Sequence, residues 1–306
     1  MHRAKGEARQ LRRARPAHII AGGDMGDEVL GISLDAATKL DGGPGTYTTV
    51  LSRAWEIWGP SGGYLAALAL RAAGLGAEIA RPASFYCQFL RPPSFGRVDL
   101  DVSLLKPSRR SEALVVQLTQ QNRPILHALV RTATDAPGYE HEQTDPPDVP
   151  SPEVLQSTDE LWADEERPPF AFWDNLERRP IDQQFRPASS TAERSSPIVR
   201  EWVRFRPAGC FDDPFVDAAR SLILLDTYGW PAAFRMHRDG TYLAPNLDTS
   251  AWFHQLGRQS EWLLIDHECP VGERGLLGVS GRVWDLDRRL VASGGAQLCC
   301  IPPPAS

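Results

Sequence analysis

Two adjacent glycines at the expected start of a helix are the first residues that suggest chemistry. The run Gly59-Pro60-Ser61-Gly62-Gly63 precedes Tyr64 and a series of apolar residues at helical spacing. The first N–H groups of a helix have no partner within it, and together with the helix dipole they favour negative charge. Glycines also let a bulky group approach the main chain closely. Gly62, Gly63 and Tyr64 are therefore expected to bind an oxygen atom on which negative charge develops.

A carboxylate in an apolar stretch is the second feature of interest. Asp248 has apolar neighbours, which are Leu247, Trp252 and Phe253. Desolvation raises the pKa of a carboxyl group and makes its ionised form a better general base. Gln297, in a strand-like run, carries an amide that both donates and accepts and so can hold a water molecule. The plainer alternative is that Asp248 closes the preceding turn and Gln297 is an ordinary polar strand residue.

The glycine-rich run also fits the G-x-S-x-G pattern of a serine-hydrolase nucleophile elbow, with Ser61 as the nucleophile. His254 or His267 would then supply the histidine that such enzymes need. That fold requires parallel strands separated by helices, whereas residues 83 to 134 offer strand-like runs joined by turns. We therefore interpret Ser61 as the N-cap of the helix and keep the serine hydrolase as an alternative.

The elements expected to carry these residues occur twice in the same order. A strand-like run at Tyr47 to Arg53 precedes a helix at Tyr64 to Ala73, and four strand-like runs follow before residue 134. In the second half, a strand at Ile198 to Phe205 precedes a helix that starts at Pro214 with Asp213 as its cap, and again four strand-like runs follow. This repeated order indicates duplication of one supersecondary unit.

Each unit is expected to be α+β, with one long helix packed on a curled antiparallel sheet, because strands joined by short turns cannot be parallel. Two such half-covered sheets can join edge to edge and pack their helices together. We therefore expect one site where the halves meet. The first half would supply the helix start at Gly62, and the second would supply Asp248 and Gln297.

Segments of biased composition suggest the domain boundaries. Residues 135–167 are acidic and rich in proline, which is typical of a linker. Residues 1–24 are rich in arginine and are expected to be a disordered basic extension, with a transit peptide or a nucleic-acid-binding tail as alternatives. The N-terminal repeat would then span residues 25–134 and the C-terminal repeat residues 168–306.

The overall composition excludes several classes of protein. The 306 residues include 33 Lys and Arg against 39 Asp and Glu, a net charge of −6, which argues against a broad nucleic-acid surface. The longest uncharged apolar stretch, residues 57 to 70, is too short and too interrupted to cross a membrane. The 5 cysteines form no C-x-x-C pair and the histidines lack metal-ligand spacing. We expect a cytoplasmic protein without metal or cofactor.

Several short motifs, spread over the two repeats, are informative through their order and spacing together with the duplication. They are Trp58-Gly59-Pro60-Ser61-Gly62-Gly63-Tyr64-Leu65, the run from Phe85 through Phe89-Leu90-Arg91-Pro92, Leu247-Asp248-Thr249-Ser250-Ala251-Trp252-Phe253-His254, Glu261-Trp262-Leu263-Leu264 and Leu290-Val291-Ala292-Ser293. Over residues 30 to 134 and 198 to 301 the chain resembles the double-hotdog acyl-CoA thioesterases of the thioesterase II type. The resemblance implies a double-hotdog fold and hydrolysis of acyl-CoA to a free acid and CoA.

The resemblance also implies roles for individual residues. In that family an Asp, a hydroxyl residue and a Gln orient the attacking water. Asp248 matches the Asp, and Gln297 matches the Gln, although it stands one position later than in the best-known pattern. The hydroxyl residue has no counterpart, because the segment after Glu268 reads Cys269-Pro270 and Cys269 takes that place. The backbone at Gly62 and Gly63 would polarise the thioester carbonyl.

The alternative function is a non-catalytic acyl-CoA-binding protein of the same fold, which the missing hydroxyl near Cys269 makes credible. Release of free thiol from acyl-CoA, compared with binding of the same esters, separates the two. The partner in either case is acyl-CoA, and a duplicated chain is compatible with a monomer or with a homo-oligomer.

Overall fold

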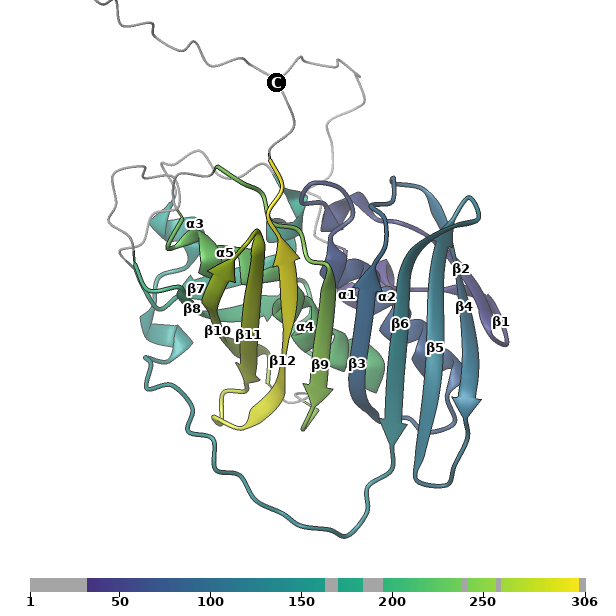
Figure 1. Ribbon diagram of the computed structural model, residues 1–306. Helices are drawn as coiled ribbons and strands as arrows, with labels where there is room; N and C mark the ends of the chain where they lie inside the picture. The colour runs from purple at the N-terminus through teal and green to yellow at the C-terminus, as the bar shows by residue number, and fades with distance from the viewer. Residues whose placement is uncertain (1–31, 163–169, 184–194, 238–240, 257–259, 303–306) are drawn as a thin grey trace, which may run out of the picture. The chain divides into compact units, whose positions relative to one another are not determined.

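The computed structural model describes residues 32–162, 170–183, 195–237, 241–256 and 260–302. The expected basic extension, residues 1–24, lies outside the described residues. Within them, the strands form one antiparallel sheet of 12 strands, in the order β1-β2-β4-β5-β6-β3-β9-β12-β11-β10-β8-β7 (Figure 1).

The first half of the chain supplies six strands and one long helix. The strands are β1 (Asp41–Gly43), β2 (Thr46–Val50), β3 (Pro82–Phe89), β4 (Arg97–Lys106), β5 (Ser111–Gln120) and β6 (Arg123–Ala133). Its helices are α1 (Leu34–Ala37) and the long α2 (Gly62–Gly76), with a 3-10 turn at Arg53–Trp55.

The second half repeats this arrangement after a connecting segment. Its strands are β7 (Leu176–Pro180), β8 (Ile198–Phe205), β9 (Asp248–Phe253), β10 (Trp262–Glu273), β11 (Leu276–Trp284) and β12 (Leu290–Cys299). Its helices are the long α4 (Pro214–Thr227) and α5 (Gly229–Phe234). The connecting segment carries α3 (Thr158–Leu161) and 3-10 turns at Pro152–Val154 and Ala171–Asn175.

The sheet order confirms the α+β architecture and the duplication. Counting along the chain, β2 corresponds to β8, α2 to α4, and β3 to β6 correspond to β9 to β12. The strands of the first half lie in the order β2-β4-β5-β6-β3, and those of the second half lie in the equivalent order β8-β10-β11-β12-β9. The halves meet where β3 pairs with β9, with Phe85 opposite Ala251.

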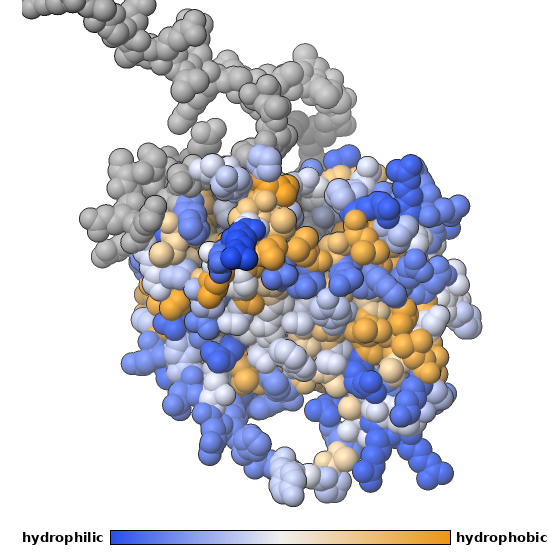
Figure 2. Space-filling model, in the orientation of Figure 1, coloured by the Kyte–Doolittle hydropathy of each residue, from blue (hydrophilic) through white to orange (hydrophobic). Residues whose placement is uncertain are grey.

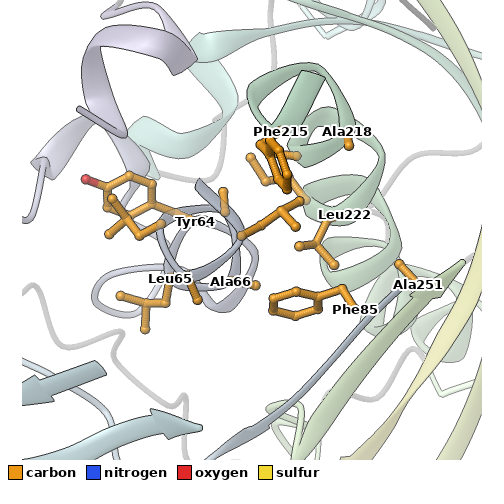
Figure 3. Close-up of a cluster of buried hydrophobic side chains, with 14 of the residues drawn as sticks. Tyr64, Leu65, Ala66, Phe85, Phe215, Ala218, Leu222 and Ala251 are labelled. Atoms are coloured by element: carbon orange, nitrogen blue, oxygen red, sulfur yellow. The ribbon is translucent and has the colours of Figure 1, made fainter. Parts of the chain in front are cut away.

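Both long helices lie on the same face of the sheet and pack against each other (Figure 1). A Cβ atom on Gly63 of α2 would lie only 3.0 Å from the Cα atom of Ile223 in α4, so the two backbones come very close. Figure 3 shows the shared core, in which Tyr64, Leu65 and Ala66 of α2 lie near Phe215, Ala218 and Leu222 of α4, with Phe85 and Ala251 from the sheet. The apolar surface of each helix is therefore buried by both halves.

The local sequence explains how each long helix begins. Asp213 caps α4 as expected, because its Oδ1 atom accepts hydrogen bonds from the N–H groups of Phe215 (2.8 Å) and Val216 (3.3 Å), and Pro214 occupies the first helical position. Ser61 occupies the N-cap position of α2, but its side chain makes no capping hydrogen bond.

The sheet face turned away from the helices mixes hydrophilic and apolar side chains (Figure 2). Residues 135–151 of the connecting segment form no helix or strand. This stretch contacts the second half, where Pro150 accepts a hydrogen bond from the Trp202 indole (2.9 Å) and Glu142 accepts one from the Leu290 N–H (3.2 Å). Among the helices in the described part of the chain, none has the length and apolar character needed to cross a membrane.

Candidate functional site

A cavity of about 1130 Å³ opens between the start of α2, the end of α4, α5 and strand β8. This volume slightly exceeds the usual range for small-molecule sites, which is about 300 to 1,000 Å³. Its walls come from both halves and are rich in aromatic side chains. These are Trp58, Phe89, Trp162, Phe170, Trp173, Tyr228, Trp230 and Phe234.

Asp226, in the last turn of α4, is the carboxylate that lines this cavity beside the start of α2. Its Oδ1 atom accepts a hydrogen bond from the hydroxyl of Thr249 (2.7 Å) and another from the side-chain amide of Asn246 (2.7 Å). Asn246 also donates to the backbone oxygen of Asp226 (2.8 Å). The carboxylate is therefore held in one orientation by the residues at the start of β9.

Two opposing effects act on the proton affinity of Asp226. Burial is the larger and raises the pKa of the carboxyl group above its ordinary value of 3.8. Hydrogen bonds from Thr249, Asn246 and the Gly63 backbone N–H act in the opposite direction, because they favour the ionised form. A carboxylate with a raised pKa is a stronger base when ionised than an ordinary aspartate, which suits it to act as a general base.

The start of α2 comes so close to Asp226 that a side chain at position 62 would displace the carboxylate. A Cβ atom at Gly62 would lie 2.9 Å from Asp226 Oδ2 and 3.0 Å from the ring of Phe89. A carboxylate from the second half thus faces backbone N–H groups from the first, as the sequence suggested. The carboxylate in this place is Asp226, which stands at the end of the apolar run Leu222 to Leu225 and which sequence reasoning missed.

Asp248 and Gln297 lie together on the other face of the sheet. The Gln297 N–H donates a hydrogen bond to Asp248 Oδ1 (2.9 Å). Successive side chains of a strand point to opposite faces. In β9 it is Thr249 that is buried toward the helices, and in β12 it is Ala296. The structure brings Asp248 and Gln297 together but places neither in the lining of the cavity, to which Gly62 belongs and Gly63 does not.

Cys269 is also absent from the cavity lining. It is buried on β10 in a small apolar cluster with Ala232 and Ala233 of α5, and burial raises the pKa of its thiol. The hydroxyl group that contacts the Asp226 carboxylate is that of Thr249. Thr249 could have been considered from the sequence, since it directly follows Asp248. Choosing between these two residues required knowing which of them faces the helices.

The side chain of Tyr64 has a structural role. Its hydroxyl donates to the backbone oxygen of Ala37 (2.8 Å) and accepts from the N–H of Ser52 (3.2 Å), and its ring stacks on Trp55. The backbone of Tyr64 lies in the first turn of α2, but Tyr64 is not among the described residues that line the cavity.

The Ser61 hydroxyl is buried, belongs to the cavity lining and has no hydrogen-bond partner among the described residues. No histidine is among the described residues that line the cavity. His254 contacts Ser293 Oγ (2.8 Å), and His267 is completely buried in β10. The described strands are also antiparallel throughout, so Ser61 lacks both the base and the parallel-strand scaffold that the serine-hydrolase alternative needs.

The duplication predicts an equivalent place at the other ends of the two helices. Gly74 stands in α2 where Asp226 stands in α4, counted from the first residue of each helix. There the ring of Phe215 lies against Gly74, and a Cβ atom at Gly74 would be 2.5 Å from that ring. One of the two related places thus carries a carboxylate, and the other is filled by an aromatic ring.

Solved structures confirm the fold. A hot dog fold protein from Alicyclobacillus acidocaldarius superposes with a TM-score of 0.76 at 19% identity, over 88% of this chain and 98% of that one. A tesB protein from Mycobacterium avium subsp. paratuberculosis gives 0.71 at 25% identity, over 88% and 98%. An acyl-CoA thioesterase II, TesB2, from Mycobacterium marinum gives 0.72 at 19% identity, over 89% and 99%. The architecture is a double hotdog.

Two family models match successive parts of the chain. The model of the acyl-CoA thioesterase N-terminal domain matches residues 51–133, and that of the acyl-CoA thioesterase C-terminal domain matches residues 141–301. Since the C-terminal match alone spans more than half of the 306 residues, the chain belongs to the acyl-CoA thioesterase family and is a thioester hydrolase.

Proposed function

We propose that the chain hydrolyses acyl-CoA with Asp226 as the general base. The observation that supports this most directly is the position of a buried carboxylate beside Gly62, at the edge of a large apolar cavity. The bond that breaks joins the acyl carbon to the CoA sulfur, and the products are a free acid and CoA.

The attacking water would be held between Asp226 and Asn246. Asp226 Oδ2 points toward Gly62, while Oδ1 is occupied by Thr249 and Asn246. The side-chain oxygen of Asn246, also in the cavity lining, has no hydrogen bond among the described residues and can accept one from the same water. This oxygen would take over the positioning role that the resemblance assigned to Gln297.

The start of α2 would stabilise the transition state. As the water attacks, its proton passes to Asp226 and negative charge develops on the thioester oxygen. Gly62 lines the cavity, and its backbone N–H group has no partner within the helix and lies at the positive end of the helix dipole. When the C–S bond breaks, Asp226 returns the proton to the CoA sulfur, so the carboxylate is regenerated.

A matched pair of variants tests this assignment against the one drawn from sequence. Asp226→Asn should lower the rate of thiol release at least about a hundredfold, the usual scale for removing a general base. Asp248→Asn should leave the rate close to that of the wild type, because the Asp248 side chain lies across the sheet from the cavity. Binding of the acyl-CoA, measured by calorimetry, should survive both changes.

The opposite pattern, with loss of turnover only in Asp248→Asn, would restore Asp248 as the base and overturn the assignment to Asp226. Saturable binding by the wild type with no thiol release from any acyl-CoA would favour the non-catalytic acyl-CoA-binding protein. Circular dichroism of each variant shows whether the fold is intact.

A further inference from the structure

A second polar group lines the cavity and has no part in the proposed hydrolysis. It consists of Glu201 on β8, Tyr228 at the end of α4 and Arg178 on β7. The hydroxyl of Tyr228 donates to Glu201 Oε2 (2.5 Å), and the Arg178 guanidinium lies 3.9 Å from the same oxygen. Glu201 is only 4% exposed. We refer to these three residues as the Glu201 cluster.

The Glu201 cluster has hydrogen-bonding capacity that the described residues do not use. Glu201 lines the cavity, and its Oε1 atom has no hydrogen bond among them, so it is free to accept one from a bound molecule. Arg178 is held by stacking on Trp173, 4.2 Å from the ring centre, and on Trp162 at 5.5 Å. Its contacts with Glu201 and Tyr228 leave several of its N–H donors unused within the described part of the chain. One acceptor and several donors are thus available to a molecule in the cavity.

The charges of the cluster favour a neutral partner. Glu201 and Arg178 carry opposite charges and offset each other, so an anion would be repelled by Glu201 and a cation by Arg178. Burial raises the pKa of Tyr228 well above its ordinary value, which keeps its hydroxyl protonated as a donor to Glu201. A hydroxyl group satisfies both free positions, because it donates to a carboxylate and accepts from a guanidinium.

The position of the cluster relative to Asp226 defines which part of a substrate it would meet. Tyr228 follows Asp226 by two residues at the end of α4, and both line the same cavity. Positions two residues apart in a helix are separated by slightly more than half a turn, so their side chains point in different directions. A substrate with its thioester at Asp226 would therefore reach the Glu201 cluster with a more distant atom of its acyl group.

We propose, on the basis of the function proposed above, that the Glu201 cluster is a subsite for a hydroxyl group on the acyl chain. The substrates would be hydroxyacyl-CoA thioesters, in which the hydroxyl donates to Glu201 Oε1 and accepts from Arg178. The hydroxyl is carried by an alkyl chain or by an aromatic ring, for which the tryptophan walls of the cavity are suited.

Matched substrate pairs test this proposal. One arm compares octanoyl-CoA with hydroxyoctanoyl-CoA isomers whose hydroxyl stands near the thioester, midway along the chain or at its end. The other arm compares phenylpropanoyl-CoA with its para-hydroxyphenyl counterpart. In at least one pair, kcat/KM should be about tenfold or more higher for the hydroxylated ester, the scale of a hydrogen bond to a charged group. Equal values in every pair, or a preference for an acyl chain ending in a carboxylate, would overturn the proposal.

Two variants connect the preference to the cluster. Glu201→Leu should bring the ratio of kcat/KM within the preferred pair to about one, and Tyr228→Phe should lower it. Glu112→Gln serves as the control, because Glu112 is an equally buried carboxyl group that contacts Thr132 (3.0 Å) and lies outside the cavity lining. An unchanged ratio in Glu201→Leu would overturn the role of the cluster.

Binding separates failure of this proposal from failure of the proposed hydrolysis. If the wild type hydrolyses none of the esters, the proposed function fails, and dissociation constants for the same pairs test the subsite. Tighter binding of the hydroxylated ester, lost in Glu201→Leu, would still support the Glu201 cluster. If the fold of Glu201→Leu is impaired, the test depends on Tyr228→Phe, which removes a single oxygen atom. An unchanged preference of that variant for the hydroxylated ester would overturn the proposal.

Discussion

At the scale of single residues, the candidate site depends on one carboxylate in an unusual environment. Asp226 is buried, which favours its protonated form, but Thr249 and Asn246 both donate to it, which favours its ionised form. The same two donors hold it against the start of α2. The cost of burying the carboxylate is thus partly offset by contacts that also orient it for a water molecule.

The raised pKa of Asp226 predicts the sign of two pH effects. The base is active only when ionised, so kcat/KM should rise with pH through a pKa above the ordinary aspartate value of 3.8 and then level off. Because the folded-state pKa is raised, the contribution of Asp226 to stability is greatest below the unfolded pKa and is lost as pH rises through the folded one. The unfolding temperature of the wild type, relative to that of Asp226→Asn, should therefore increase as the solution is acidified. A rate that falls with rising pH over this range would contradict the assignment.

At the scale of elements, the start of α2 serves both the site and the packing of the two long helices. Gly62 and Gly63 are consecutive but face different neighbours. Gly62 faces the Asp226 carboxylate and the ring of Phe89, which are ends of side chains, whereas Gly63 faces the backbone of Ile223 in α4. The side chains that face Gly62 can move to admit a small added group, whereas the backbone that faces Gly63 can move only if α4 moves.

Alanine at the two positions should therefore have different effects. Gly62→Ala should lower thiol release by about ten- to a hundredfold through displacement of Asp226, with little change in unfolding temperature. Gly63→Ala should lower the unfolding temperature clearly, because α2 and α4 must separate. Gly43→Ala is the control, since a Cβ atom there has no neighbour within 4 Å. Thermal denaturation and thiol-release assays on the three variants check this, and equal destabilisation by Gly62→Ala and Gly63→Ala would contradict it.

At the scale of the whole molecule, the two repeats share one sheet and one core within the described part of the chain. β3 pairs with β9 over Ser84 to Gln88, and α2 and α4 share one apolar core. The covalent connection through residues 135–151 has little secondary structure, and Tyr139 in it is fully exposed. The noncovalent contacts between the repeats should thus suffice to hold them together.

Cutting the connection should leave an active complex. A protease recognition sequence inserted after Tyr139 and cleaved in the folded protein should give two fragments that migrate together in size-exclusion chromatography and separate only in denaturant. Thiol release should persist, because Gly62 and Asp226 remain in contact through the helix packing. Separation of the fragments in native buffer would show that the connection, and not the shared sheet, holds the halves together.

The sequence by itself determined the architecture and the general position of the site. The repeated order of strand, long helix and four strands predicted a duplicated α+β unit, and the glycines before Tyr64 predicted a helix start open to negative charge. These features are local, because periodicity, turns and caps depend on residues that are near each other in the chain.

Only the tertiary structure decided which carboxylate meets that helix start. Asp248 and Thr249 are neighbours in sequence, but because side chains alternate along a strand they lie on opposite faces of β9. A shift of one residue in the pairing register would exchange the faces on which they lie. In the sequence, Asp226 is only the polar end of an apolar helix. Its position beside Gly62 follows from the antiparallel packing of α4 against α2. The Glu201 cluster is likewise brought together from three separate elements. Which side chains share a cavity depends on pairing between distant segments, and the local pattern of residue types does not record that pairing.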